Sequence, residues 1–273
     1  MRIVSLQSGS NGNCIFVETN GIRLLFDAGL TAKKTAENLA TVGVDVLSVH
    51  GVLISHDHAD HVKGAGALHR KFDLPIWLTR KTCEAAAANR KNPVHLESPQ
   101  FFKAGQRIRF DNNVSVETLP TPHDAVDGVG FVVDDGTLRF AILTDLGHVF
   151  PELERIFPTL DGVLIESNYD PTMLEANEKY PSWLKDRIRG KHGHLSNRDA
   201  SLLIKKAGLR LRVACLGHLS QENNTPELAM DPYQVKSFKR SLPIRIAPRD
   251  RCVELWDSDQ TASLLDAQVG EVP

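Results

Sequence analysis

Short apolar runs separated by glycine-rich turns dominate the first third of the chain. Runs of this length, rich in β-branched residues and bounded by turn residues, are typical of β-strands. Between them, residues 31–43 carry apolar side chains at helical spacing and end in a glycine, which predicts a helix. The strands expected here are "RIVSL", "CIFVE", "IRLLFDAG" and "GVLISHDH".

Strands also dominate the middle of the chain, and helices alternate with strands on both sides of it. After residue 62 the pattern predicts helices in "AGALHRKF" and "KTCEAAAANR" and strands in "PIWLT", "RIRF", "VSVETL", "VGFVVD" and "LRFAILTD". The last part predicts helices in "PELERIF", "PSWLKDRI", "NRDASLLIKKAG" and "PELAMDPYQVKSFKRSL", and strands in "DGVLIES", "LRVACLG", "PIRIA" and "CVELW". Such an order predicts sheets covered by helices, an α/β layered fold. We expect one domain over residues 1–257 and a loose polar tail over 258–273.

The composition is that of an ordinary globular protein, with 41% hydrophobic and 24% charged residues. No apolar run approaches the roughly 20 residues of a membrane helix, and the opening segment lacks the long apolar stretch of a signal peptide. The cysteines form no Cys-x-x-Cys pair, so we expect reduced thiols in a cytoplasmic protein that has no membrane partner. They are Cys14, Cys83, Cys215 and Cys252.

Positive charge is concentrated in one part of the chain although the net charge is −2. Between residues 185 and 212, nine lysines and arginines are opposed only by Asp186 and Asp199. One interpretation is a solvated helix face, and the other is a patch that binds a phosphate backbone. Charge alone does not decide between them.

The densest group of polar side chains lies in "ISHDHADHVKG". Three imidazoles and two carboxylates fall within six positions, after a β-branched run and before a glycine and a helix, so we place them in a loop at a strand end. These groups suit first-row divalent cations, with Zn, Mn and Fe as candidates. The His-x-His part can hold one ion and the Asp-His part a neighbouring one. The residues are His56, Asp57, His58, Asp60 and His61.

This loop resembles the His-x-His-x-Asp-His signature of the metallo-β-lactamase superfamily, and the resemblance extends along nearly the whole chain. "TLPTPHDAV", "AILTDLG" and "VACLGHLS" each place a histidine or aspartate after an expected strand, and "LLFDAG" matches the early supporting aspartate, Asp27. The resemblance implies a four-layer αββα sandwich that holds two divalent metal ions. It assigns one metal to His56, His58 and His123, the other to Asp60, His61 and His218, and the bridging position to Asp145.

The same residues argue against several known branches of the superfamily. Asp145 has no cysteine near it, whereas true β-lactamases use a cysteine ligand at that place. His58 stands where flavo-diiron members carry glutamate, and no helical domain for a thioester substrate of the glyoxalase type is evident. Asp60 also lies where it can orient the nucleophile, which adds a catalytic role to its role as ligand.

The segment from "VLIESNYD" to the second "GHLS" is similar to ribonuclease Z, in which a strand ends in glutamate and a Gly-His-Ser-Thr segment opens a helix. The similarity implies that Glu166 pairs with His194 and that His194 protonates the leaving oxygen. A carboxylate partner raises the pKa of a histidine and fixes its tautomer, which suits a general acid. This chain departs from the pattern with Leu195-Ser196, and no projecting tRNA arm is identifiable.

Four segments resemble the YycJ/WalJ-type subgroup of the superfamily: "SGSNGNC", "SHDHADHVKG", "GHLSN" and "LGHLSQENNTPELA". That resemblance implies a metal-dependent 5′-to-3′ exonuclease of double-stranded DNA, with a metal-bridged hydroxide as nucleophile. The alternatives are ribonuclease Z-like RNA processing, and hydrolysis of a small cyclic phosphodiester or a thioester. A metal-holding scaffold without chemistry is a further alternative from a different class.

"GHLS" occurs twice, yet its flanks differ, so the copies are not repeats of one unit. We interpret His218 in the second copy as a metal ligand and His194 in the first as the proton donor. Ser196 is expected to cap a helix with Asp199 three positions on, and "TPE" begins another helix. Because helix N-termini bind phosphate, the residues expected to contact substrate are Ser196, Asn197, Asn223 and Asn224. The alternative for these residues is plain helix stability.

Overall fold

The computed structural model describes residues 1–234 and 242–259, which form two facing β-sheets. The first sheet contains β1 (Arg2–Gln7), β2 (Cys14–Thr19), β3 (Ile22–Phe26), β4 (Gly51–Leu53), β5 (Ile76–Thr79), β6 (Gln100–Phe102) and β14 (Val253–Asp257). The second contains β7 (Arg107–Arg109), β8 (Ser115–Pro120), β9 (Val129–Asp134), β10 (Arg139–Leu143), β11 (Gly162–Glu166), β12 (Val213–Gly217) and β13 (Ile244–Ile246). The strand orders are β14-β1-β2-β3-β4-β5-β6 and β13-β12-β11-β10-β9-β8-β7.

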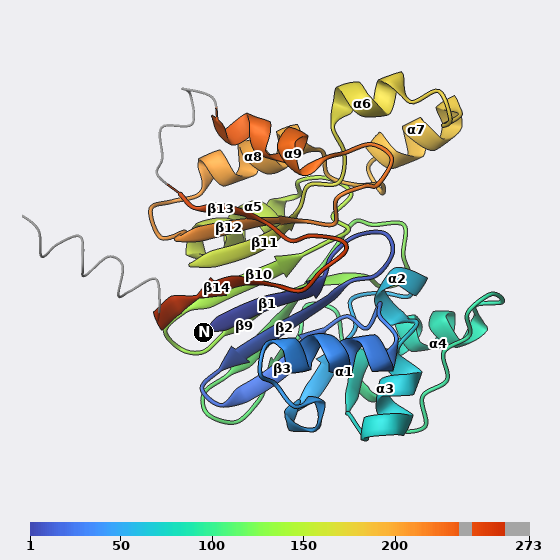
Figure 1. The fold of residues 1–273 in the computed structure, drawn as a ribbon, viewed down its shortest axis with the longest axis vertical. Helices are drawn as coiled ribbons and strands as arrows, with labels where there is room; N and C mark the ends of the chain where they lie inside the picture. The colour runs from blue at the N-terminus through green and yellow to red at the C-terminus, as the bar shows by residue number, and fades with distance from the viewer. Residues whose placement is uncertain (235–241, 260–273) are drawn as a thin grey trace, which may run out of the picture.

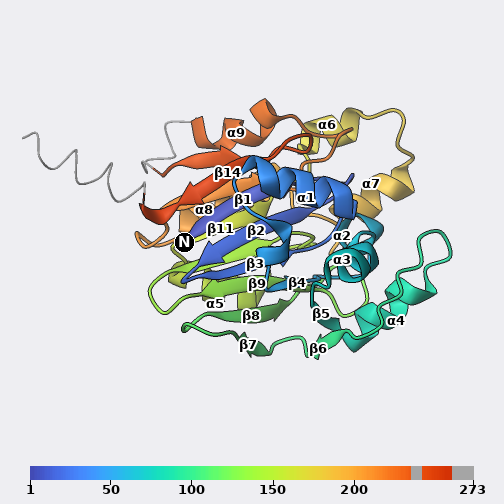
Figure 2. The same ribbon diagram turned by 60° about the horizontal axis from the view of Figure 1, so that its bottom comes forward.

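Helices cover the outer face of each sheet, as Figures 1 and 2 show. The first sheet is accompanied by α1 (Ala32–Thr41), α2 (Ala59–Val62), α3 (Ala65–Phe72) and α4 (Arg80–Ala88). The second is covered by α5 (Pro151–Ile156), α8 (Asn197–Lys206) and α9 (Pro226–Gln234). Two further helices, α6 (Pro171–Ala176) and α7 (Ser182–Arg189), stand beyond the strand ends, and the short 3-10 turns are η1 (Val46–Ser48) and η2 (Phe157–Thr159).

Three separate apolar clusters hold these layers together. The inner cluster, with Phe131 and Trp256, fills the space between the two sheets. Leu39 and Leu68 attach α1 and α3 to the first sheet, and Leu203 attaches α8 to the second. Three buried seams between four layers confirm the predicted αββα sandwich.

Parallel strands direct the functional loops to one end of the molecule. β10, β11, β12 and β13 run parallel, and Glu166 at the end of β11 pairs with Gly217 at the end of β12. In the first sheet β3, β4, β5 and β6 are also parallel. Because the carboxyl ends of parallel strands share an edge, the loops that follow them converge. Figures 1 and 2 show α2, α6 and α7 at this same end.

Most of the expected elements are confirmed, and the ones that were missed are short. β6, α2 and α6, of three to six residues each, were not predicted. The loop expected for the whole histidine cluster was wrong in part, because Asp60 and His61 lie in α2. The helix expected over 226–242 is described as far as Gln234, and its remainder and most of the expected tail lie outside the described residues. Within residues 1–234 and 242–259, no helix has the length and apolar character needed to cross a membrane.

Candidate metal and active site

The loop that carries the histidine cluster is fixed by backbone bonds from a neighbouring loop. The amide of Ala28 donates to the carbonyl of His61 over 2.7 Å, and the amide of Gly64 donates to the carbonyl of Ala28 over 2.7 Å. A Cβ atom added to Gly64 would lie 1.9 Å from the carbonyl oxygen of Leu30. Glycine at this position therefore lets the two loops pack closely enough to hold α2 in place.

Three residues at the strand ends adopt backbone conformations that are uncommon outside glycine. The φ angles are 64° at Asp27, 54° at Asp145 and 54° at His218. Such left-handed residues cost free energy and gather at functional sites, where the surrounding structure enforces them. Asp27 follows β3, Asp145 follows β10 and His218 follows β12, so each turn aims its side chain toward the shared edge of the sheets.

The predicted ligands gather in two groups of three. Within each group, one potential ligand atom per residue lies within 4.8 Å of the others. The two groups adjoin each other, because Asp145 forms a further such group with His56 of one and His61 of the other. The groups are His56, His58 and His123, and Asp60, His61 and His218.

Asp145 lies between the two groups. Its Oδ1 is 3.4 Å from Nε2 of His123, and its Oδ2 is 3.1 Å from Nε2 of His61. The carboxylate thus presents one oxygen to each group, which is the arrangement that a bridging ligand needs.

The other ring nitrogen of several histidines is held by a fixed partner. Nδ1 of His61 is 2.7 Å from Oδ2 of Asp27, and Nδ1 of His123 is 2.8 Å from the carbonyl oxygen of Gly193. Each partner can accept a hydrogen bond from Nδ1–H, and this contact turns Nε2 toward the centre. This is the outer arrangement usual for metal-binding histidines.

Two buried nitrogen atoms test whether a cation fits. Nε2 of His56 and Nε2 of His123 make no hydrogen bond with any side chain or backbone group of the described residues. Burial lowers the pKa of both histidines, so both imidazoles are neutral and carry a lone pair. A buried polar atom without a partner costs about 1–3 kcal/mol. A divalent cation would satisfy both nitrogens, and the nearby carboxylates would balance its charge, so the donor set fits divalent metal binding.

One carboxylate contacts both GHLS histidines. Oε1 of the buried Glu166 is 2.7 Å from Nδ1 of His194 and 3.2 Å from Nδ1 of His218. Its Oε2 accepts hydrogen bonds from the amides of Leu146 and Leu195, at 2.9 and 3.0 Å. The expected contact of Glu166 with His194 is present, and its contact with His218 was not foreseen.

The charge on this carboxylate follows from its neighbours. Burial alone would raise the pKa of Glu166, but His194 and His218 together outweigh burial and lower this pKa to about 2. Burial would likewise lower the pKa of His194, and the Glu166 carboxylate reverses the shift and raises it. The pair therefore favours an ionised carboxylate beside a protonated imidazole.

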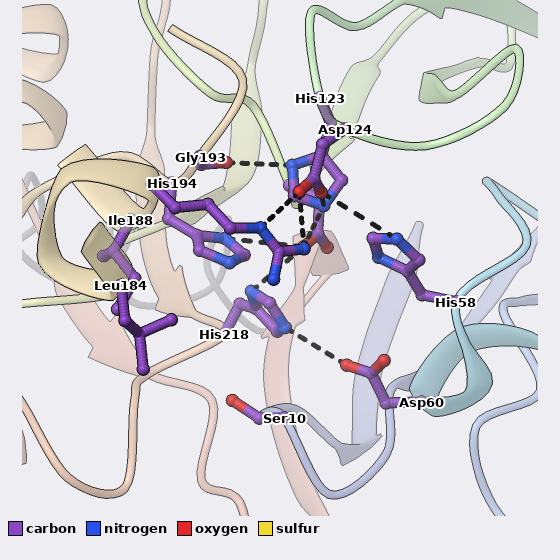
Figure 3. Close-up of a pocket in the computed structure, with 12 residues that line it drawn as sticks. Ser10, His58, Asp60, His123, Asp124, Leu184, Ile188, Gly193, His194 and His218 are labelled. Atoms are coloured by element: carbon purple, nitrogen blue, oxygen red, sulfur yellow. Dashed lines mark hydrogen bonds and ion pairs between the residues drawn. The ribbon is translucent and has the colours of Figure 1, made fainter. Parts of the chain in front are cut away.

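A cleft of about 240 Å³ opens onto this centre (Figure 3). It is also lined by Ser10 and Asp124, which the sequence analysis did not single out, and by Arg187 of the basic stretch. Nε of Arg187 is 2.8 Å from Oδ2 of Asp124. For Asp124, the sequence offered one signal of its place in the cleft, namely its position directly after His123. A residue next to a predicted ligand lies at the same site as that ligand.

The residues expected to contact substrate have their polar atoms occupied within the fold. Ser196 caps α8, accepting from the amide of Asp199 over 3.1 Å. Nδ2 of Asn197 donates to Oδ1 of Asn224 over 3.0 Å, and Oδ1 of Asn223 accepts from Asn177 over 2.7 Å. Ser196, Asn197, Asn223 and Asn224 are all buried, and none of them lines the cleft. This environment favours the alternative interpretation, in which they stabilise the starts of α8 and α9.

The basic stretch does not form one surface. Arg210 and Arg212 lie just before β12, at the end opposite His218, and both pair with Asp161, which directly precedes β11. Lys206 pairs with Glu154. Of the nine basic residues, Arg187 is the one that lines the cleft. The stretch therefore brings one basic residue of α7 to the cleft, and phosphate binding stays a prediction.

Sequence comparison agrees with this architecture. A family model described as "Beta-lactamase superfamily domain" matches residues 22–219. The chain belongs to the β-lactamase superfamily, which confirms the resemblance of its fold and its histidine–aspartate cluster.

Two relatives narrow the group. Exodeoxyribonuclease WalJ of Streptococcus pneumoniae serotype 2 is 38% identical over 229 residues, covering 82% of this chain and 83% of the relative. Exodeoxyribonuclease YycJ of Bacillus anthracis is 33% identical over 225 residues, covering 82% and 84%. These matches confirm the similarity to the YycJ/WalJ-type subgroup. The crystal structure of human tRNase Z, short form, has a TM-score of 0.62 at 16% identity, over 94% of this chain and 100% of the other, which shows a shared fold.

Proposed function

We propose that this protein is a 5′-to-3′ exonuclease of double-stranded DNA that works with two divalent cations. The observation that carries the proposal is the pair of three-residue ligand groups joined by Asp145 beside the contact between Glu166 and His194. The similarity to relatives named as exodeoxyribonucleases supports DNA as the substrate.

The ligand groups determine where the cations bind. His56, His58 and His123 would hold one cation, and Asp60, His61 and His218 would hold the other, with Asp145 between the two groups. Imidazole and carboxylate donors suit Zn, Mn or Fe. When bound, two such ions bring the pKa of a shared water toward neutrality and balance the charge on the scissile phosphate.

The remaining residues position the reactants. Asp60 is partly exposed in the cleft and orients the attacking water. Glu166 accepts a hydrogen bond from Nδ1–H of His194. The proton on Nε2 of His194 is then the one given to the oxygen that leaves the phosphorus. Glu166 also contacts His218. In this proposal the two GHLS copies have different roles, because His218 holds a cation and His194 protonates the leaving oxygen.

The location of the protein follows from the same proposal. Cys14, Cys83, Cys215 and Cys252 are free thiols, which is usual in the reducing cytoplasm. The bacterial relatives named as exodeoxyribonucleases fit the same compartment, so we assign the protein to the cytoplasm.

A labelled-substrate assay tests the proposal. Duplex DNA labelled at the 5′ or the 3′ end is incubated with the purified protein and Mn, Zn or Mg. We expect the 5′ label to appear at once as a short product and the 3′ label to appear in a ladder of shortened strands. Precursor tRNA, bis-p-nitrophenyl phosphate and a thioester are assayed in parallel. Cleavage of the tRNA or the thioester without degradation of the duplex would replace the proposal with the corresponding alternative.

A further inference from the structure

α7 forms one wall of the metal cleft although none of its side chains is buried. Leu184, Arg187 and Ile188 line the cleft, and Figure 3 shows Leu184 and Ile188 on the side opposite Asp60. The preceding residue, Trp183, is 66% exposed. Tryptophan is normally well buried, so a ring left open to solvent beside a reactive cleft indicates a binding role.

Helical geometry places this ring next to a cation. Trp183 and Arg187 are four positions apart, so they are neighbours on one stripe of the helix surface. Leu184 and Ile188 form the adjacent stripe, which faces the cleft. Helical spacing therefore puts Trp183 one turn from Arg187, on the stripe next to the one that faces the cleft.

Arg187 keeps hydrogen-bond donors available. Its Nε and Nη2 both contact Oδ2 of Asp124, at 2.8 and 2.5 Å. Its Nη1 makes no hydrogen bond within residues 1–234 and 242–259, and a guanidinium has five N–H donors in a planar fork. Arg189 on the same helix is instead engaged by Asp186 and Glu175. Arg187 is thus held in place by one carboxylate while it can still bind a second anion.

We propose that α7 binds the free end of the DNA duplex, with Arg187 on a backbone phosphate and Trp183 stacked on the terminal base pair. The inference rests on the proposed function and names the part of the substrate that α7 recognises. Inside a duplex, each base pair stacks on a neighbouring pair at both of its faces. The base pair at an end has a neighbour on one side only, so its other aromatic face is free. An exposed indole on this helix can cover that face, and stacking of this kind tolerates any sequence. Arginine binds phosphate through two parallel hydrogen bonds.

The role of Trp183 is tested with two duplexes of equal length. One is linear with blunt ends, and the other is a dumbbell whose ends are closed by loops; both carry phosphorothioate linkages that resist cleavage. For the full chain with Trp183→Ala, we expect affinity for the linear duplex to fall by roughly tenfold and affinity for the dumbbell to fall much less. Trp183→Phe, which retains a ring, should restore most of the loss. Leu47→Ala is the matched control, because Leu47 is 67% exposed but lies in η1.

The role of Arg187 is tested by salt dependence. We expect Arg187→Ala to lower the slope of log affinity against log salt by about one unit, which corresponds to one lost phosphate contact. Arg187→Lys should keep the slope and lose part of the affinity. Arg210→Ala is the control, since Arg210 is also paired with an aspartate but lies at the opposite strand end.

The outcomes separate this inference from the proposed function. A wild-type protein that degrades duplex DNA, combined with a Trp183→Ala variant that binds the linear duplex as tightly as wild type, overturns the inference alone. Equal losses on the linear duplex and the dumbbell also overturn it, because the ring would then contact the duplex away from its end. A wild-type protein that neither binds nor degrades DNA overturns both.

Discussion

The metal-binding loops and the segment α6–α7, residues 171–189, lie side by side at the same end of the molecule but are built in opposite ways. The loops are buried and fixed by several partners for each side chain; His61, for example, is fully buried and contacts Asp27, Asp60 and Asp145. In α7 no side chain is buried, and the contacts of the helix are exposed ion pairs and single hydrogen bonds.

Under the two proposals, the buried loops cleave the substrate and the exposed helix α7 binds it. Two cations and a proton donor need positions accurate to a fraction of an ångström, which only a packed and fully bonded environment provides. A long polymer that must move after each cut needs contacts that form and release. Exposed ion pairs contribute little to stability, so the inferred exchange of these pairs for contacts with DNA would require little free energy.

The largest expected effect is loss of a ligand. His218→Ala removes one of three donors from the second group, so we expect that cation to be lost and activity to fall to background. Metal content by mass spectrometry and duplex degradation measure the two effects. An active variant with full metal content would remove His218 from the ligand set.

The other GHLS copy should behave differently. His194→Ala leaves all seven proposed ligands, so we expect metal content to be retained while duplex degradation falls by about 10²–10⁴-fold, the usual contribution of a general acid. Bis-p-nitrophenyl phosphate has a leaving group that needs no proton, and its hydrolysis should suffer far less. Equal losses on both substrates would contradict the proton-donor role.

A smaller effect is expected from Asp27, which forms a hydrogen bond with the proposed ligand His61. Asp27→Asn keeps a side chain that tolerates the left-handed backbone but removes the charge beside Nδ1 of His61. We expect metal affinity to fall by about 10–100-fold, measured by competition with a chelating dye. Asp135→Asn is the control, since Asp135 is also buried and bonds to Thr19, far from the ligands. Unchanged affinity in Asp27→Asn would show that the charge is dispensable.

The smallest expected effects concern stability. Gly64→Ala forces a Cβ against the carbonyl of Leu30, and we expect the free energy of unfolding in urea to fall by about 1–3 kcal/mol. Gly208→Ala adds a Cβ with no atom within 4 Å and serves as the control. Trp183→Ala should change the free energy of unfolding by less than about 0.5 kcal/mol, as expected for an exposed position. A loss at Trp183 as large as that at Gly64 would contradict the contrast between the two regions.

The sequence predicted the buried region well because its signals are local. Five polar residues within six positions identify the loop of His56 to His61, and the order of later strands leads to Asp145 and His218 through the family resemblance. The αββα layers follow from the alternation of strands and helices, which repeats over many residues and is therefore robust. The metal-binding roles themselves stay predictions.

The region around α7 could not be predicted in the same way. The contact of Arg187 with Asp124 joins residues 63 positions apart and depends on how the loop after α7 returns to the cleft. Asn197 and Asn224 were predicted to contact substrate, but their side chains bond to each other. The sequence of a helix start does not show whether its polar side chains face solvent or one another. Burial, which distinguishes these cases, is a property of the tertiary structure.

The division of the ligands between the two sheets has a consequence for biosynthesis. His56 to His61 belong to the first sheet, and the remaining ligands follow strands of the second, ending with His218 after β12. The first sheet is itself completed by β14, which pairs with β1 from the opposite end of the chain. A growing chain on the ribosome therefore lacks the complete cluster until His218 has been added, and it lacks the complete first sheet until β14 has been made. Whatever chemistry the cluster performs cannot begin before that point of synthesis.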